Sequence, residues 1–289
     1  MALNALARLI NELYRGMFMK KFLVLFSALV LSVSVMACDS GSSSTGETTG
    51  GETTGETTGE ETSGEEGGEV EPTTVTISDW TTGDALEGVS ICINVEGYDC
   101  VATDADGVAS FDGDLAIGTE VQMTGDLEGY FPFLVEFTVT DQTAGSSSTY
   151  VMAPNEIVGV VAQSVGEEPL DDKGHLTVVA WGPADDEGVR YGVVGATVTV
   201  TGEYSSGPKY YNLIEDLGDG VFGPDEDGTT GAGMAGYFNV APGTVSFVVT
   251  AEGHDCTTPF NGFVADDGQI TASINEARLT YASVLCELN

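Results

Sequence analysis

The pattern of hydrophobic and polar residues changes sharply at Pro72. After this residue, short runs of β-branched and aromatic side chains alternate with turns rich in Gly, Asp and Asn, which is typical of β-strands. The run Ala196–Thr201 alternates residue by residue, so we expect Val198 and Val200 to face a core and three threonines to face outward. No amphipathic helix of useful length is predicted after residue 38. The chain from residue 73 onward is therefore predicted to be all-β.

We expect these strands to form two modules, residues 73–153 and residues 154–289. The strands predicted for the first module are Thr74–Ser78, Val89–Val95, Asp99–Thr103, Val108–Phe111, Glu120–Thr124 and Phe131–Thr140. The strands predicted for the second are Ile157–Ala162, Leu176–Trp181, Ala196–Thr201, Tyr210–Ile214, Tyr237–Val240, Val245–Ala251, Ile270–Ile274 and Leu279–Leu285.

The N-terminal part of the chain has the plan of a secretory signal peptide over residues 1–37. Met19-Lys20-Lys21 supplies a positive start, an apolar run follows from Phe22, and the small residue Ala37 ends it. The run is interrupted by serines and is shorter than the roughly 20 apolar residues of a bilayer span. Because Met-Lys-Lys is already a complete signal start, we expect Met19 to be the true first residue. The alternatives are a start at Met17 and an extended N-terminal region over residues 1–18.

The end of this signal, Val35-Met36-Ala37-Cys38, resembles the lipobox of bacterial lipoproteins. The resemblance implies that Cys38 is lipidated and becomes the new N-terminus, so that the partner of this end of the chain is a membrane. The competing interpretation is an ordinary signal peptide with an incidental cysteine. Asp39 resembles an inner-membrane retention signal of enteric bacteria, a rule that does not extend to other lineages. We expect a location in the bacterial cell envelope, at the outer membrane or cell surface rather than the inner membrane.

Residues 38–72 form a tether of Ser, Gly, Thr and Glu with a repeated Gly-Glu-Thr-Thr pattern and no aliphatic side chain between Asp39 and Val70. Such a segment cannot bury enough apolar surface to offset its conformational entropy, so it is expected to be disordered. A flexible chain of this length spans roughly 30 Å.

Charge is distributed very unevenly along the chain. The formal net charge is −38, and the residues after Cys38 carry four Lys or Arg and 45 Asp or Glu, a net charge of −41. This charge excludes nucleic acid as a partner, since two polyanions repel each other. The acids of the chain also repel one another, and dissolved salt screens this repulsion over roughly 8 Å. A salty habitat is one hypothesis that fits so acidic a chain.

Three motifs of the first module occur in the order found in one family. Gly83–Ile91, Ala102–Phe111 and Gly129-Tyr130 resemble the carboxypeptidase regulatory-like family, small transthyretin-like β-sandwiches with a "G-x-P-L-x-G-V-x-V" strand, a "T-D-x-D-G-x-F-x-F" hairpin and a late "G-Y". The motifs depart from the family pattern at two positions: Ala85 replaces the usual Pro, and Ala109 stands where the pattern expects an apolar residue. Weaker counterparts in the second module are Val193–Val200, Ala235–Gly243 and Ala251–His254. The resemblance implies two small Ig-like or transthyretin-like β-sandwiches and says little about activity.

The chain has five cysteines, and lipidation of Cys38 would leave two in each module. If Gly97 takes the left-handed position of a three-residue turn Val95-Glu96-Gly97, Cys92 faces Cys100 across a hairpin. We therefore predict a Cys92–Cys100 disulfide, and a Cys256–Cys286 disulfide that pins the last strand. A metal site built on the cysteines is not indicated: His254, two residues before Cys256, is the one His or Cys within four residues of any cysteine, and a single such pair supplies too few ligands.

Acidic turns are the candidate metal sites. Clustered carboxylates between glycines suit Ca²⁺, although neither turn matches the EF-hand register and aspartates also form Asx-turns without metal. The candidate ligands are Asp104, Asp106 and Asp112 in one turn and Asp216, Asp219, Asp225 and Asp227 in a longer loop.

Aromatic residues are the candidate binding residues. We expect Trp80, Trp181, Tyr210 and Tyr211 to be partly exposed, where they stack on a sugar or a partner protein or cap a sandwich edge. His175 and His254 each stand alone, and the chain lacks His-x-His, His-Glu-x-x-His, Gly-x-Ser-x-Gly, Asp-Thr-Gly and a phosphate-binding Gly loop. No cofactor is indicated apart from Ca²⁺.

Three functions fit these observations. The favoured one is a lipid-anchored, non-enzymatic envelope protein whose modules serve adhesion, ligand binding or spacing, with an unknown protein or glycan ligand. The second is a carbohydrate-binding surface lipoprotein, with or without Ca²⁺. The third is an envelope hydrolase of an unfamiliar type, which requires a pocket with convergent acids of split pKa.

Overall fold

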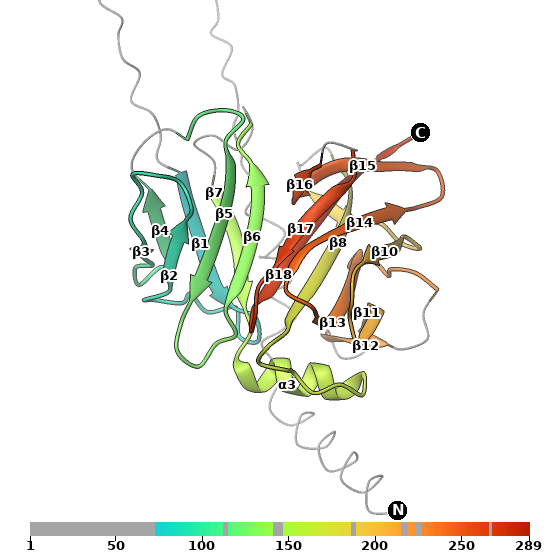
Figure 1. The fold of residues 1–289 in the computed structure, drawn as a ribbon, viewed down its shortest axis with the longest axis horizontal. Coiled ribbons are helices and arrows are strands. Elements are labelled where there is room, and N and C mark those ends of the chain that lie inside the picture. Colours follow the sequence, from blue (N-terminus) through green and yellow to red (C-terminus); the bar gives the residue numbers. More distant parts are fainter. Residues whose placement is uncertain are drawn as a thin grey trace, which may run out of the picture.

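The computed structural model describes residues 73–111, 115–140, 147–185, 189–214, 219–223, 227–265 and 268–289. The predicted signal peptide, the predicted tether and Cys38 lie outside these residues. Residues 73–153 are called module 1 and residues 154–289 module 2. The described chain is all-β, as predicted, except for one helix that the sequence pattern does not predict, and its two halves lie side by side in Figure 1.

The strands of module 1 are β1 (Thr73–Asp79), β2 (Ser90–Ile93), β3 (Val101–Ala102), β4 (Val108–Phe111), β5 (Glu120–Asp126), β6 (Phe133–Thr138) and β7 (Ser147–Met152). Module 2 opens with helix α3 (Asn155–Ser164) and continues with β8 (Gly174–Ala184), β9 (Arg190–Gly192), β10 (Thr197–Thr201), β11 (Ser206–Ile214), β12 (Asp219–Gly223), β13 (Met234–Val240), β14 (Gly243–Thr250), β15 (His254–Asn261), β16 (Phe263–Val264), β17 (Ile270–Ile274) and β18 (Leu279–Leu288).

Three sheets build the two sandwiches. A three-stranded sheet has the order β4-β1-β7, and a four-stranded sheet has the order β10-β14-β17-β16. An eleven-stranded sheet has the order β12-β11-β13-β8-β18-β6-β5-β2-β3, with β15 paired to β18 and β9 to β8. This long sheet continues through both modules. Each module therefore consists of part of the long sheet packed against a small sheet of its own.

Strand β18 joins the modules. It pairs in parallel with β8 over Leu279–Leu285 and with β6 of module 1 over Leu279–Tyr281. The sequence predicted this strand as part of module 2, and nothing local indicated that its second neighbour belongs to module 1. The junction is thus hydrogen-bonded backbone rather than a flexible linker.

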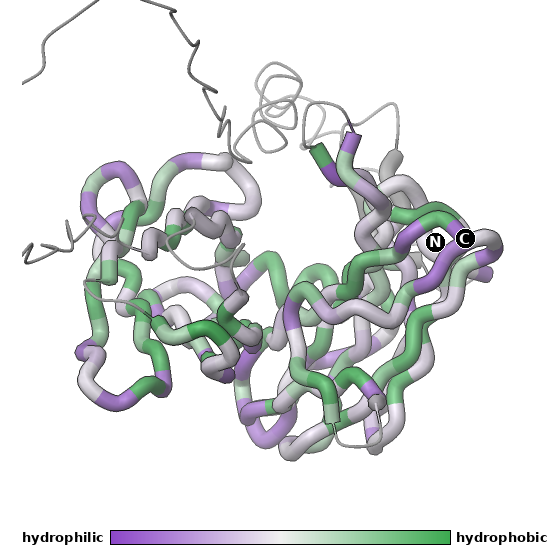
Figure 2. Tube along the Cα trace, turned by 90° about the horizontal axis from the view of Figure 1, so that it is seen from above, coloured by the Kyte–Doolittle hydropathy of each residue, from purple (hydrophilic) through white to green (hydrophobic). Residues whose placement is uncertain are grey.

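Alternating side chains fill a main core in each module, and a smaller buried cluster lies beside α3. The core of module 1 includes Ile77, Ile91 and Met123, and Tyr281 of β18 packs against it. The core of module 2 includes Leu176, Tyr237 and Phe247. In β10, Val198 and Val200 are buried and Thr199 and Thr201 are exposed, as the alternation predicts. Figure 2, coloured by hydropathy, shows the two halves from above, with several hydrophilic outer turns.

The prediction of a strand at Ile157–Ala162, and of no helix after residue 38, is wrong. Residues Asn155–Ser164 form α3, which begins after Pro154 and buries Val158 and Ala162, one helical turn apart. Ala162 packs against Tyr211, Phe222 and Phe238 of module 2. The β-branched composition favoured a strand, and this tertiary contact overrides that weak preference.

The sequence pattern does not predict several further strands. β9 and β16 are two to three residues long, β7 begins in a serine run, and β15 contains Pro259. β15 pairs only with β18, so Pro259 lies in an edge strand, where its missing N–H costs least. No helix in the described part of the chain is long and apolar enough to span a membrane.

Candidate functional site

The hairpin disulfide Cys92–Cys100 is present. β2 and β3 pair with Ile91 opposite Val101, a register that places Cys92 opposite Cys100. Gly97 has a φ of 93°, and the N–H of Tyr98 donates to the carbonyl of Val95. The predicted three-residue turn and cross-strand bridge are therefore confirmed.

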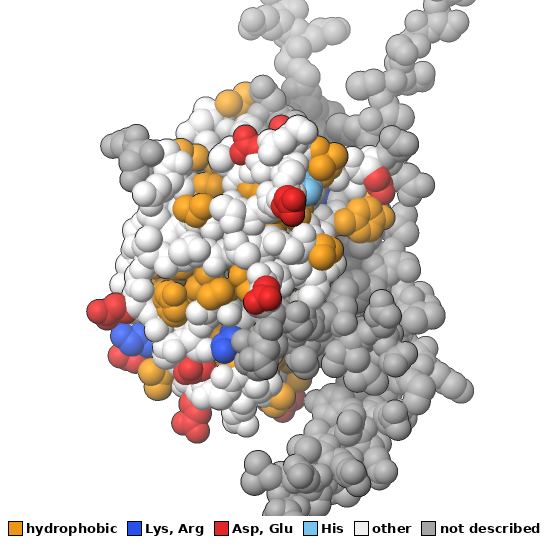
Figure 3. All heavy atoms as spheres, turned by 90° about the vertical axis from the view of Figure 1, so that its right-hand side faces the viewer, with side chains coloured by type: hydrophobic (Ala, Val, Ile, Leu, Met, Phe, Trp, Pro, Cys, Tyr) orange, Lys and Arg blue, Asp and Glu red, His pale blue; other side chains and the backbone are white. Residues whose placement is uncertain are grey.

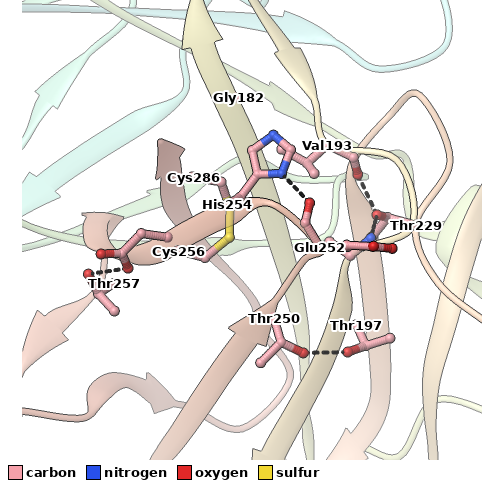
Figure 4. Close-up of a disulfide and its surroundings, with 12 residues drawn as sticks. Gly182, Val193, Thr197, Thr229, Thr250, Glu252, His254, Cys256, Thr257 and Cys286 are labelled. Carbon is pink, nitrogen blue, oxygen red and sulfur yellow. Dashed lines mark hydrogen bonds between the residues drawn. A yellow bond between two sulfur atoms is a disulfide. The ribbon is translucent and has the colours of Figure 1, made fainter. Parts of the chain in front are cut away.

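The second disulfide, Cys256–Cys286, joins β15 to β18 (Figure 4). The pairing of Asp255 with Glu287 places these cysteines opposite each other. The bridge fixes the edge strand β15 to β18, the strand that joins the modules. Four of the five cysteines are thereby accounted for, and Cys38 is the remaining one.

The Ca²⁺ candidates divide into described and undescribed residues. Asp104 makes an Asx-turn, in which its Oδ1 accepts from the N–H groups of Asp106 and Val108 at 2.9 Å each. Asp106 and Asp227 are exposed. No three His, Cys, Asp or Glu residues in the described ranges are arranged to hold a metal. Asp112, Asp216 and Asp225 and the side chain of Asp219 lie outside the described parts, so a Ca²⁺ site there stays a prediction.

The prediction that Tyr210 and Tyr211 are exposed binding residues is wrong. Their exposed fractions are 5% and 6%, because β11 is covered on both faces and successive strand residues point to opposite sides. Tyr210 joins the core of module 2, and Tyr211 packs edge-on against Phe222. Trp80 is half-buried and packs with α3 in this same cluster, and Trp181 is half-buried on β8. These four aromatics do not form one flat exposed face.

The contact between the modules centres on a buried carboxyl group. Glu136 of β6 is 1% exposed. Its Oε1 accepts from Nε2 of Gln122 at 2.6 Å, and its Oε2 accepts from the N–H of Ser273 in module 2 at 2.8 Å. Its backbone carbonyl accepts from the N–H of Gly262 at 2.6 Å. One residue of module 1 thus satisfies two backbone N–H groups of module 2.

An ion pair lies beside this contact. The guanidinium of Arg278 binds both carboxylate oxygens of Asp126, with a shortest distance of 2.8 Å, and also donates to the carbonyl of Phe133. Arg278 is one of four basic residues after Cys38. A bidentate pair of this kind orients both partners, although partial exposure limits its energy.

His175 lies in the boundary between the modules. Its ring is 5.4 Å from the ring of Phe131 in module 1 and 5.6 Å from that of Phe238 in module 2. Nδ1 accepts from the N–H of Asn239, and Nε2 is buried without a partner. Burial lowers the pKa of His175 to about 4, so the ring is neutral at physiological pH. This enclosed histidine is a packing element.

In module 1, the motifs that resemble the carboxypeptidase regulatory-like family have structural roles. Tyr130, from the Gly-Tyr motif, donates to Oδ2 of Asp79 at 2.7 Å, which raises the pKa of Tyr130 to about 12. Burial acts to raise the pKa of Asp79, but hydrogen bonds from Thr81, Tyr130 and Thr82 outweigh it, so the pKa lies below its usual value. Gly107 has a φ of 75°, and a Cβ there would lie 2.5 Å from the carbonyl oxygen of Ile77.

A groove opens beside the buried Glu136. It has a volume of about 440 Å³ and lies between Gln122 of module 1 and residues 242–244 and 273–276 of module 2. Its side chains are mostly amides and hydroxyls, among them Gln122, Thr244 and Asn275, with Glu276 as the one acid. Such a lining can recognise hydroxyl groups through hydrogen bonds, and it is the candidate binding site of the described structure.

Sequence reasoning missed the residues that join the modules. Two of them could have been found from the sequence. Glu136 is the one acid in the apolar run Phe131–Phe137, and Arg278 is one of the few bases of the chain. Gln122 and Ser273 gave no such signal, because their roles depend on contacts between distant segments.

No protein-family model matches the chain, and no curated protein matches it. Solved structures show low similarity. The 5-hydroxyisourate hydrolase of Klebsiella pneumoniae is 20% identical over 29% of this chain and 91% of its own, with a TM-score of 0.24. The minor pilin of Streptococcus agalactiae is 10% identical over 75% of this chain and 96% of its own, with a TM-score of 0.24. The shaft pilin of Lactobacillus rhamnosus GG is 11% identical over 76% of this chain and 98% of its own, with a TM-score of 0.22. Likeness at this level carries no argument about function.

Proposed function

We propose that this chain is a lipid-anchored protein of the bacterial cell envelope that presents two joined β-sandwiches as a non-enzymatic binding, adhesion or spacer unit. Its anchor is Cys38, and residues 39–72 hold the folded part away from the membrane. Its location is the outer membrane or cell surface, and its ligand there is a protein or a glycan.

The pairing of the cysteines is the observation that carries this proposal. Cys92 bonds to Cys100 and Cys256 bonds to Cys286, so the only cysteine left over is the one that ends the lipobox-like Val35-Met36-Ala37-Cys38. Two disulfides favour an oxidising compartment outside the cytoplasm. Lipidation of Cys38 and the formation of two disulfides both require export from the cytoplasm, so the two features support the same location.

The joined sheet supports the role as a presenting unit. β18 pairs with strands of both modules, and Glu136 and Arg278 add side-chain contacts across the boundary. A body of this kind keeps a fixed shape at the end of a tether. His175, which has the most strongly lowered pKa among the described acids and bases, is enclosed by aromatic rings and serves packing.

Mass spectrometry of the mature protein tests the proposal. We expect its N-terminal residue to be Cys38 carrying a diacylglycerol group, and a Cys38→Ser variant to leave the membrane fraction. A Cys92→Ser/Cys100→Ser variant is the matched control, because it removes two cysteines and should keep the lipid. A mature N-terminus at another residue, or a membrane-bound Cys38→Ser variant, would contradict the proposal.

A further inference from the structure

The outer face of the four-stranded sheet carries no charge. We call this surface the hydroxyl face. On β10 it presents Thr197, Thr199 and Thr201, and on β14 it presents Ser246, Val248 and Thr250, because the residues between them point into the core. Strands β10, β14, β16 and β17 contain no Asp, Glu, Lys or Arg.

The absence of charge here is informative because the chain around it is so acidic. The residues after Cys38 include 45 acids, whereas the long sheet places charged residues in several strands, including Glu120 on β5 and Asp255 on β15. Figure 3 shows the side of module 2, where uncharged polar and hydrophobic atoms cover most of the described surface and acids are scattered. A cationic partner would be drawn to the acidic surfaces and away from this face.

The hydroxyl groups of the face are held in place by cross-strand contacts. The hydroxyls of Thr197 and Thr250 share a hydrogen bond of 2.7 Å (Figure 4). The hydroxyl of Thr201 accepts from the N–H of Ser246 at 3.1 Å and donates to its carbonyl at 3.0 Å. A hydroxyl has one donor and two acceptor positions, so acceptor capacity remains for a ligand. Neighbouring strands lie about 4.8 Å apart, which makes the surface a regular array of hydroxyl and methyl groups.

The face is continuous with the groove between the modules. Thr244 and Ser273 are paired across β14 and β17, point to the same side as Ser246, and line the groove. The amides of Gln122 and Asn275 stand at this end. The surface therefore combines a flat area with an adjoining recess, both lined mainly by uncharged hydrogen-bonding groups.

We propose that the hydroxyl face and the groove bind an uncharged, hydroxyl-rich polymer, namely a neutral polysaccharide. Hydroxyls and amides match the alternating donors and acceptors of a sugar chain, and threonine methyl groups match its C–H surfaces. An apolar partner fits poorly, because the large apolar side chains of the face stand apart among hydroxyls: Val248, 51% exposed, lies at its centre and Phe263, half-buried and paired with Thr271, at its β16 edge. A second copy fits poorly as well, because it would bring together two chains that each carry a net charge of −41 after Cys38. The inference deepens the proposed function by naming the class of ligand; it rests on the proposed binding role and is independent of the lipid anchor.

Co-sedimentation of the purified mature protein in mild detergent tests the proposal. The probes are microcrystalline cellulose, chitin, insoluble β-1,3-glucan and starch granules, with an insoluble acidic polysaccharide gel as comparison. We expect binding to at least one neutral probe and at least ten-fold weaker binding for Thr199→Glu/Val248→Glu, which places two carboxylates at paired positions in the centre of the face. The control, Thr149→Glu/Ser164→Glu, adds the same charge at exposed positions on β7 and α3 and should bind as the wild type does.

Circular dichroism checks the fold of each variant, and Thr199→Lys serves as a milder variant if the double one fails to fold. Thr199→Lys should also weaken binding, because any charge disturbs a neutral face. Binding to none of the neutral probes, or equal binding by the face and control variants, would overturn the proposal. So would self-association that the Thr199 variants abolish, since it would make a second copy the occupant. Lipidation of Cys38 is read separately by mass spectrometry.

Discussion

The two outer edges of the four-stranded sheet are closed by different parts of the molecule. At the β10 edge, the N–H of Val198 donates to the Tyr210 hydroxyl at 3.3 Å, and the Tyr237 hydroxyl donates to the Val198 carbonyl at 2.7 Å. At the opposite edge, β16 covers β17 only at Ile270 and Thr271. Beyond it, the N–H of Ser273 donates to Glu136, and the Ser273 carbonyl accepts from the Thr280 hydroxyl at 2.8 Å.

The difference shows which module depends on the other. Tyr210 and Tyr237 belong to module 2, so this module closes its β10 edge by itself. Glu136 belongs to module 1, so the β17 edge is complete only when both modules are folded together. An unsatisfied buried N–H costs free energy, and an open edge also invites pairing with another chain. Module 1 is thus a structural requirement of module 2 as well as its neighbour.

The largest expected effect comes from Glu136→Gln. Both carboxyl oxygens accept hydrogen bonds in a site that is 1% exposed, and the new amide NH₂ would face either Gln122 or Ser273 donor to donor. We expect a loss of about 3 kcal/mol in the free energy of unfolding, measured by urea denaturation. The control is Glu120→Gln, an exposed residue on the adjacent strand β5, which should change stability by less than about 0.5 kcal/mol. Equal small effects would show that the β17 edge does not need Glu136.

His175 makes the boundary sensitive to pH. Its pKa is lowered from 6.5 to about 4 in the folded protein, so the unfolded chain takes up the proton first. Stability is therefore complete above about pH 6.5 and falls as the pH drops toward 4, by about 2 kcal/mol at pH 5. Asp79, whose pKa lies below 3.8, adds a loss only in more acidic solution.

Denaturation at pH 8 and pH 5 measures this dependence on His175. His175→Phe should flatten the slope between these values even if it lowers stability at both, because it removes the titrating group. His254→Gln, which changes the one other histidine, should keep the slope. An unchanged slope in His175→Phe would assign the effect to other groups.

The β10 edge gives a smaller effect. Tyr237→Phe removes the donor to the Val198 carbonyl and leaves this oxygen without its partner. We expect a loss of about 1–2 kcal/mol, less than for Glu136→Gln because one neutral hydrogen bond is lost. Tyr204→Phe is the control: Tyr204 packs edge-on against Tyr237 and is 37% exposed. A larger loss at Tyr237 than at Glu136 would reverse the comparison between the edges.

The smallest expected effect is an increase in stability. Ala277 has a φ of 49° in the turn that leads from β17 to β18. Glycine adopts this left-handed conformation without the penalty of a Cβ, so Ala277→Gly should stabilise the protein by about 0.5–1 kcal/mol. Thermal denaturation would detect a higher melting temperature, whereas a decrease would show that the loss of chain entropy dominates.

Local features of the fold could be predicted from the sequence, and long-range ones could not. The alternation of Ala196–Thr201 and the turn at Gly97 determined the faces of β10 and the register of Cys92–Cys100, because both depend on neighbouring residues. The sequence pattern predicts a strand where α3 forms and exposed side chains at Tyr210 and Tyr211, and both predictions fail because the elements that cover these residues come from distant segments. The same is true of the bond between Glu136 and Ser273, which are 137 residues apart.

Native-state hydrogen exchange tests most directly whether the two modules form one cooperative unit. The most protected amides of β2 and β5 in module 1 and of β14 and β17 in module 2 are the probes. We predict that both sets open with the same free energy and that Glu136→Gln lowers both by the same amount. A module 1 that keeps its protection while module 2 opens, in the wild type or in this variant, would contradict this cooperative unit.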